Sequence, residues 1–318
     1  MTTHDVVRPY TPVTLRARVL GVLFMAAAAG VSLLAGAQGK AAVQRTVYVV
    51  ATDAVGAHVT DLAPTDLKVQ DGGRERAILR VEPSRSRLKV AFVIDELLSA
   101  DVSIRVAAFQ SIQRIAASGN VALFLVGRRN EKLVDYNTSD MLVFRDAING
   151  FPIRPQYPGN LVESLFEIIK EQHALEGRRV VVVLAPEIPQ QSSVTANGVL
   201  DQLRDNGVAL YAVTITVSSR GGTLVESPAT RLEGGDLTSE MERERVLNDG
   251  PKQTGGLHVS LLGPEGFGLA LDRVTGELLH QYAVTYVIPA GVKSDGRVKI
   301  EATRKGLTVR GPNLMPKV

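Results

Sequence analysis

Two hydrophobic patterns alternate through the middle of the chain. Runs of consecutive apolar, largely β-branched residues are typical of strands that are buried on both faces, as in a parallel sheet covered by helices. Such runs occupy residues 88–95, 121–126, 179–184 and 208–215, and one more strand is expected at residues 257–260. Between them, apolar residues recur at helical spacing, which predicts helices over residues 102–117, 141–148, 161–173, 194–205 and 265–279. Because strands that alternate with helices imply right-handed crossovers, we expect an α/β fold with a doubly wound, mainly parallel sheet.

The first of these helices carries Val106, Phe109, Ile112 and Ile115 at spacings of three residues. We expect these side chains to face the core. Residues 132–135 follow the second buried strand closely, and they predict a short strand at the edge of the sheet.

Both ends of the chain show a period-two alternation, which is typical of half-buried strands. It predicts strands at residues 43–52, 67–70 and 74–81, and again at residues 281–288 and 297–303. Asp71, Gly72 and Gly73 form a strong hairpin signal between the second and third of them. Three short strands are too few to be stable alone. We therefore expect residues 43–84 and 281–311 to form one small β-sandwich-like domain, into which an α/β domain of residues 87–280 is inserted.

Residues 218–253 interrupt the alternation. Ser, Gly, Thr, Glu and Arg dominate this stretch, which favours a mobile insertion with one charged helix around residues 237–247. The run of charged residues at 240–244 is interpreted as a solvated helix face.

The amino terminus has the pattern of a secretory signal peptide, residues 1–37. Arg16 and Arg18 precede an uncharged stretch that ends in Ala35-Gly36-Ala37, so we expect cleavage before Gln38. The alternative is an uncleaved helix, because the stretch is just long enough to span a bilayer. Its alanine-rich composition favours cleavage. In either case the rest of the chain is expected to be extracytoplasmic, periplasmic or secreted, with contact to a membrane only through this segment.

Composition removes several functional classes. The chain of 318 residues has no cysteine, which excludes disulfides, zinc–thiolate sites and cysteine nucleophiles. Tryptophan is absent and aromatic residues make up 5%, which disfavours stacking platforms for single-stranded nucleic acid. The sequence pI is about 9.1. Without residues 1–37, however, 33 basic residues face 32 acidic ones, so the charge gives no reason to expect a nucleic-acid partner.

Polar residues gather where the predicted strands end. Asp95 ends the first buried strand, and ligands of open α/β sheets bind outside the carboxyl ends of the strands. The loops at this edge give a candidate ligand-binding face, which consists of Asp95, Glu96, Ser99, Thr138, Asn160 and Glu187. The sequence has no phosphate-binding loop, no histidines at metal-binding spacing and no serine nucleophile elbow. We therefore expect no enzymatic activity, with a hydrolase that uses Asp95 and Glu187 as the rival hypothesis.

Two stretches carry a family pattern. Residues 53–72 match D-x-x-G-x-x-V-x-x-L-x-x-x-D-L-x-V-x-D-G, and residues 278–286 match L-x-x-Q-Y-x-V-x-Y before a basic strand at 299–310. In this respect the chain resembles bacterial von Willebrand factor A-related (VWFA-related) proteins over essentially its whole length after the signal peptide. The resemblance implies a Rossmann-like von Willebrand A-type domain that binds other proteins.

The resemblance also implies a metal-ion-dependent adhesion site (MIDAS) at the carboxyl edge of the sheet. Its usual first motif is D-x-S-x-S, but residues 95–99 read Asp-Glu-Leu-Leu-Ser, so Leu97 replaces the middle hydroxyl. Asn160 stands at the position of the expected threonine and Pro186 at that of the expected aspartate. Because Mg²⁺ needs several oxygen ligands, we expect a degenerate site with no metal and no cofactor. A metal-dependent adhesion protein with a weak residual site at Asp95 and Ser99 is the alternative.

Overall fold

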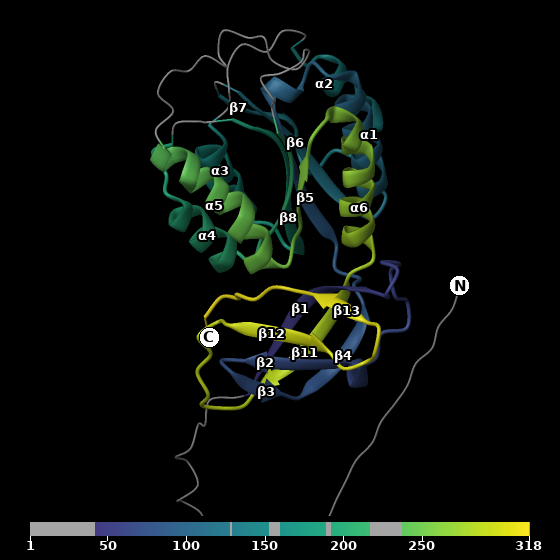
Figure 1. Cartoon of the computed structure of the whole chain (residues 1–318), viewed down its shortest axis with the longest axis vertical. Coiled ribbons are helices and arrows are strands. Elements are labelled where there is room, and N and C mark those ends of the chain that lie inside the picture. Colours follow the sequence, from purple (N-terminus) through teal and green to yellow (C-terminus); the bar gives the residue numbers. More distant parts are fainter. Residues whose placement is uncertain (1–41, 128, 153–159, 189–191, 217–236, 318) are drawn as a thin grey trace, which may run out of the picture. The chain divides into compact units, whose positions relative to one another are not determined.

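A six-stranded sheet forms the centre of the α/β part of the chain in the computed structural model (Figure 1). The structure describes residues 42–127, 129–152, 160–188, 192–216 and 237–317, so the predicted signal peptide and residues 217–236 lie outside the described residues. The strands are β5 (Leu88–Asp95), β6 (Gly119–Val126), β7 (Asn130–Val134), β8 (Arg178–Glu187), β9 (Ala209–Thr216) and β10 (His258–Leu261).

The order of these strands is β10-β9-β8-β5-β6-β7. All neighbours are parallel except β7, which pairs with β6 in antiparallel orientation at one edge. Counted along the α/β part, the order is 3-2-1-4-5-6, which is that of a doubly wound fold. The predicted α/β fold with a mainly parallel sheet is therefore confirmed.

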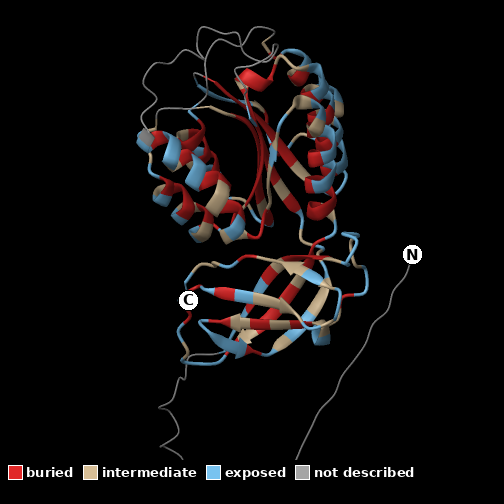
Figure 2. Cartoon of the chain, viewed as in Figure 1, coloured by how far each residue is buried: buried red, intermediate tan, exposed pale blue. Residues whose placement is uncertain are grey.

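Helices cover both faces of this sheet (Figure 1). On one face lie α1 (Val102–Ala116), α2 (Met141–Asn149) and α6 (Phe267–Leu279); on the other lie α3 (Leu161–Gln172), α4 (Ala196–Asp205) and α5 (Leu237–Thr254). Residues 90–94 of β5 have no exposed surface. Their side chains alternate between the two faces, which explains why this strand is an unbroken apolar run. In Figure 2 the strands of the central sheet are largely coloured as buried.

The inward face of α1 differs from the expected one. Val106 is 50% exposed, whereas Ile104, Ala108, Ile112 and Ile115 are buried. Val106 and Ile115 are nine residues apart, or about two and a half helical turns, so the two side chains leave opposite sides of the helix. Spacings of three residues drift around a helix, and the core face follows a mixture of threes and fours instead.

The insertion also differs from its prediction. Its second half belongs to α5, which continues to Thr254 and buries Val246 and Leu247 in the core beside α3 and α4. Gly250 permits this packing, because a Cβ atom there would lie 2.7 Å from a methyl carbon of Leu210. The expectation of a mobile segment is therefore wrong for residues 237–253.

Two smaller antiparallel sheets are built from both ends of the described chain. One has the order β13-β1-β11-β4 and the other β12-β2-β3. Their strands are β1 (Val43–Thr52), β2 (Leu67–Asp71), β3 (Arg74–Arg76), β4 (Ile78–Pro83), β11 (Tyr282–Ile288), β12 (Val298–Ala302) and β13 (Thr308–Arg310). The predicted strand at 74–81 is thus two strands that belong to different sheets. Residues of both sheets share one hydrophobic core, to which β1, β2, β11 and β12 all contribute.

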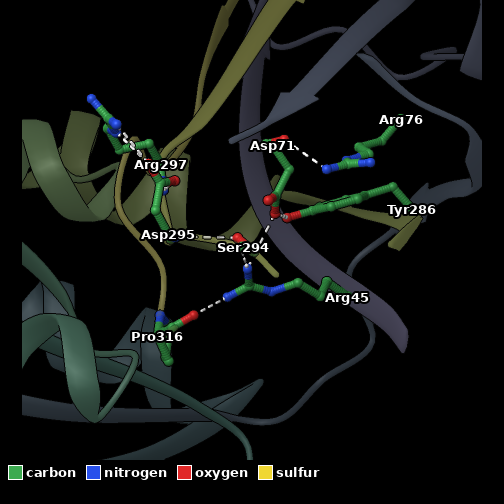
Figure 3. A network of polar contacts seen from close by, with 9 residues as sticks. Arg45, Asp71, Arg76, Tyr286, Ser294, Asp295, Arg297 and Pro316 are labelled. Atoms are coloured by element: carbon green, nitrogen blue, oxygen red, sulfur yellow. Dashed lines mark hydrogen bonds and ion pairs between the residues drawn. The ribbon is translucent and has the colours of Figure 1, made fainter. Parts of the chain in front are cut away.

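A buried polar network links the two small sheets (Figure 3). The Asp71 side chain has no exposed surface, and its Oδ2 accepts hydrogen bonds from Arg45 Nη1 at 3.1 Å and from the Tyr286 hydroxyl at 2.7 Å. Arg76 donates to the Asp71 carbonyl at 3.0 Å. Arg45 also donates to the Pro316 carbonyl, which attaches the carboxyl-terminal segment to β1. Burial and the bond to Asp71 raise the pKa of Tyr286.

This network gives a first prediction. Asp71→Asn leaves the buried Arg45 guanidinium without its carboxylate, so we expect the free energy of unfolding to fall by about 3 kcal/mol in urea titrations. Asp295→Asn is the matched control, because Asp295 pairs with Arg297 at the surface, where an ion pair contributes about 0.5 kcal/mol. If the free energy of unfolding falls equally in the two variants, the buried network stabilises the fold no more than a surface ion pair does.

Candidate functional site

The candidate site lies where β5 and β8 end side by side. These two strands are the first and fourth of the α/β part, so the strand order reverses between them. This switch point is where doubly wound folds bind their ligands. Asp95 ends β5, and Pro186 and Glu187 end β8. Pro186 was expected in the following loop, but it belongs to the strand. Proline is tolerated there because the ladder with β5 has already ended at Leu184.

Asp95 shapes the turn that follows it. Its side chain has no exposed surface, and Oδ1 accepts from the Leu97 backbone N–H at 2.9 Å, which caps the short 3-10 helix η2 (Glu96–Leu98). Leu97 and Leu98 are both buried. The residue that replaces the middle hydroxyl of the motif therefore packs into the interior instead of facing a ligand.

Glu96 lies on the other side of this turn, beside Gly127. A Cβ atom on Gly127 would lie 1.9 Å from Glu96 Oε2, so a larger residue there would displace the carboxylate from its present position. Glu96 lines a surface hollow of about 490 Å³ together with Leu125, Gly127, Arg129 and Glu131. This hollow adjoins the strand ends and presents charges of both signs.

Ser99 fastens a neighbouring loop. Its side chain is buried, and its hydroxyl donates to the Pro152 carbonyl at 3.1 Å. The Ser99 carbonyl in turn accepts from Arg105, which also donates to the Phe151 carbonyl at 3.1 Å. These contacts hold the segment after α2 against the start of α1.

Glu187 is held by hydroxyl groups of the two next strands. Its carboxylate accepts from Thr214 at 2.7 Å, from Thr216 at 2.7 Å and from Ser260 at 2.6 Å. Burial by itself would raise the pKa of Glu187. The three hydrogen bonds and the charge of Arg243 outweigh that effect, so its pKa lies below the ordinary value. The carboxylate is therefore ionised at neutral pH.

Arg243 of α5 is a site residue that sequence reasoning missed. It is 5% exposed, and its Nη2 donates to the Pro186 carbonyl. Burial lowers the pKa of Arg243, while the charges of Asp95, Glu187 and Glu240 favour the charged form. The interpretation of residues 240–244 as a solvated face is wrong at this position. One signal was available, since Arg243 stands three, four and seven residues before Val246, Leu247 and Gly250, on the buried side of the helix.

His258 extends the network from Glu187 toward α5. Because the Thr214 hydroxyl donates to Glu187, it accepts from His258 Nε2, at 2.9 Å. The other ring nitrogen, Nδ1, lies 3.0 Å from Asn248 Oδ1. Burial lowers the pKa of His258. A chain of polar contacts thus runs from β8 through β9 and β10 to α5.

Thr138 and Asn160 lie on flanking segments. Thr138 belongs to a turn after β7, where its backbone N–H donates to the Asp135 carbonyl at 3.1 Å. Asn160 precedes α3, and its carbonyl accepts from the Ser164 hydroxyl at 2.6 Å. The hydrogen bonds of both residues hold their own turns together, whereas Asp95, Glu187 and Arg243 meet at the strand ends.

The donor set does not fit the metal ion that the fold family implies. Leu97 is buried and has no donor atom, the Ser99 side chain is buried, and Pro186 offers only a carbonyl, which accepts from Arg243. A divalent cation would also be repelled by the guanidinium. Across the described ranges, three or more His, Asp or Glu side chains nowhere gather in a way that could hold a metal.

Solved structures with a similar fold have low sequence identity. Proximal thread matrix protein 1 from the mussel byssus, solved with a zinc-occupied MIDAS motif, is 13% identical with a TM-score of 0.42, over 66% of this chain and 49% of that protein. BatB from Bacteroides thetaiotaomicron is 11% identical with a TM-score of 0.41, over 60% and 98%. The SpRpn10 VWA domain is 11% identical with a TM-score of 0.40, over 59% and 95%. No family model and no curated protein matches the sequence.

This chain thus spans about half the length of the byssus protein. Because all three TM-scores are below 0.5, the class of the protein rests on its own topology. The doubly wound strand order and the antiparallel edge strand β7 give the α/β part a von Willebrand A-type, Rossmann-like fold. Its candidate site lies at the switch point of that fold.

The environment of Glu187 gives a second prediction. A carboxyl group whose pKa is lower in the folded than in the unfolded protein stabilises the fold above its unfolded pKa, and this stabilisation is lost as the pH falls through the folded value. The ordinary value is 4.5. Glu187→Gln should therefore cost about 1–2 kcal/mol at pH 7, and the cost should shrink as the pH falls below 4.5.

Urea titrations between about pH 7 and pH 3 measure this dependence. Glu176→Gln, which changes an exposed glutamate in the loop after α3, is the control and should give no pH-dependent difference. A constant cost for Glu187→Gln over the whole range would contradict the assigned role of the charge.

Proposed function

We propose that this chain is an exported protein-interaction module of von Willebrand A type that binds its partner without a metal ion and catalyses no reaction. One observation carries the proposal. The guanidinium of Arg243 lies buried at the Pro186 carbonyl, which is the position where the fold family uses a metal-coordinating carboxylate. The strand ends thus contain a positive charge, that of Arg243, without a bound metal ion. The surface around them therefore does not need a metal ion to bind a partner.

The surface beside these strand ends suits a protein partner. The hollow at Glu96 is lined by the apolar Leu125 and by the charged side chains of Arg129 and Glu131. Protein interfaces typically combine apolar and polar side chains in this way. The near balance of basic and acidic residues and the scarcity of aromatic ones make nucleic acid a poor candidate.

The contacts of Asp95 and Glu187 speak against a hydrolase. A general acid or base must reach the substrate, and its pKa should be close to the working pH. Asp95 is fully buried, while both Glu187 oxygens accept hydrogen bonds and the Glu187 pKa is lowered. Thr214, His258 and Asn248 also follow one another in space, but the Thr214 hydroxyl donates to Glu187 and not to His258, so His258 is not arranged as its base. The Thr214 side chain has no exposed surface, so no substrate reaches its hydroxyl.

A residual metal site at Asp95 and Ser99 is the weaker candidate. Asp95 Oδ1 accepts a hydrogen bond from the Leu97 backbone N–H and so caps η2, and the Ser99 hydroxyl donates a hydrogen bond to the Pro152 carbonyl. Together they would give an ion one carboxylate and one hydroxyl, and both lie under the surface. Mg²⁺ would need the remaining ligands from water in a space that Arg243 shares.

Export is supported by the charged, apolar and small-residue regions of residues 1–37. Within the ranges that the structure covers, no helix has the length and apolar character needed to cross a bilayer. We predict a mature amino terminus at or near Gln38. Amino-terminal sequencing of the protein from fractionated cells measures it, and a full-length cytoplasmic form would contradict export.

The metal-free reading gives a further prediction. Millimolar Mg²⁺, Mn²⁺ or EDTA should leave the thermal stability of the mature chain unchanged, since an ion stabilises a fold only when its concentration exceeds its dissociation constant. Isothermal titration calorimetry should show no stoichiometric heat of binding. If stoichiometric binding is found and Asp95→Ala abolishes it, metal-dependent adhesion becomes the better description.

Partner capture tests the face itself. A tagged mature chain is used to capture proteins from the extracytoplasmic fraction in Mg²⁺ and in EDTA, and the same proteins should be bound in both buffers. Glu131→Arg reverses a charge that lines the hollow and should reduce capture about tenfold, which corresponds to about 1.4 kcal/mol. Arg80→Glu on β4 reverses an exposed charge in the small sheets and serves as control. Equal capture by both variants would place the binding surface elsewhere.

A further inference from the structure

Arg243 is an unusual cation for the interior of a protein. Its guanidinium carries five N–H donors in a rigid plane and stays charged at all physiological pH values. Nevertheless it is 5% exposed, and its Nε has no hydrogen-bond partner within the described residues. A charge buried in this way requires opposite charges close by. The structure supplies them at the ends of two strands.

The carboxylates around Arg243 come from several elements. Asp95 at the end of β5 and Glu187 at the end of β8 act on its charge, as does Glu240 from its own helix. The hydrogen bond to the Pro186 carbonyl places the guanidinium at the end of β8 itself. His258 on β10 is the remaining titratable group nearby, and the Arg243 charge lowers its pKa further. The direct contact of the cation is thus with β8, and the carboxylates at the ends of both strands favour its charged form.

Contacts on both sides of Arg243 hold α5 in place. Glu242 accepts from the backbone N–H of Ala196 at the start of α4, and Ser239 accepts from the backbone N–H of Ser192 at 3.3 Å. Farther along, Thr254 accepts from the backbone N–H of Leu210 at 3.0 Å and so joins the end of α5 to β9. The helix is thus attached near each end, and its inward side carries Arg243 to the strand ends.

We propose that Arg243 is a built-in cation of the strand-end site, whose guanidinium takes the place of a metal ion and ties helix α5 to the end of β8. This inference rests on the proposed metal-independent function and gives its physical cause. The positive charge is part of the chain, so the site exists in one state whatever the concentration of divalent cations outside the cell. Removal of the guanidinium should turn a metal-independent site into one that responds to added cations.

The experiment removes the charge and then replaces it from solution. The mature chain is compared with Arg243→Ala and Arg243→Lys in thermal unfolding, alone and with millimolar Mg²⁺, Mn²⁺ or methylguanidinium. Arg243→Ala should lower the Tm by about 5 °C or more. Methylguanidinium or a divalent cation should restore about half of that loss, because either one binds the folded state with its uncompensated carboxylates. Arg243→Lys keeps a cation and should lose clearly less than Arg243→Ala.

Arg245→Ala is the matched control on the same helix. Arg245 is exposed and pairs with Asp249 at 3.8 Å, so its removal should change neither the Tm nor the response to cations. The parent chain should not respond to any of the additives. If Arg243→Ala does not fold, Arg243→Gln carries the test, because it removes the charge but keeps a long polar side chain, and its Tm should then rise with methylguanidinium or Mg²⁺ while that of the parent does not.

Failure of this inference can be told apart from failure of the proposed metal-independent function. If the Arg243 variants lose stability equally and no cation restores it, the residue only fills space and the inference is wrong, while the metal-free function stands. If the parent chain itself is stabilised by Mg²⁺ or Mn²⁺, the proposed function fails first. If Arg243→Ala is as stable as the parent, the buried charge contributes nothing and the inference is equally wrong.

Discussion

The small sheets depend on one pairing that joins the two ends of the chain. β1 lies between β11 and β13, so both of its neighbours are made only after the whole α/β part. The backbone N–H of Ser84 donates to the Gln281 carbonyl at 2.8 Å, which brings the beginning and the end of the α/β part together. Since isolated strands are unstable, residues 43–52 cannot form their sheet until the carboxyl-terminal strands are present. An inserted α/β part is the direct consequence.

Buried charges are the second constraint, and the chain buries an arginine at two places. In the small sheets, Asp71 pairs with Arg45 and accepts from Tyr286. At the switch point, Arg243 donates to the Pro186 carbonyl, and the charges of Asp95 and Glu187 favour its charged form. Each buried ion is matched because an unmatched one would cost more than the surrounding packing provides. The first arrangement lies inside the core of the small sheets, whereas the second lies at the edge of the central sheet where loops begin.

The carboxylates of the site could be predicted because their positions follow from local pattern. Asp95 and Glu187 each come at the end of an apolar run, and the ends of parallel strands meet at one edge. The hydroxyls that hold Glu187 could not be predicted. Thr214 lies opposite Ala185, and Ser260 lies opposite Thr214, only because β8, β9 and β10 pair in one particular register. Arg243 was missed because a charged residue in a charged run looks solvated until the packing of its helix is known.

The sequence by itself determined which segments are strands and helices and which strands are buried on both faces. These properties depend on the period of apolar residues along the chain, which is a local quantity. Tertiary structure alone decided that residues 74–83 divide between two sheets, that Val106 faces outward and that α5 packs against the sheet. Each of these depends on which partner an element meets. The same holds for the strand-end site. Its positive charge comes from Arg243 on α5, about 150 residues after Asp95. Contacts between residues so far apart are set by packing and not by the local period of apolar residues.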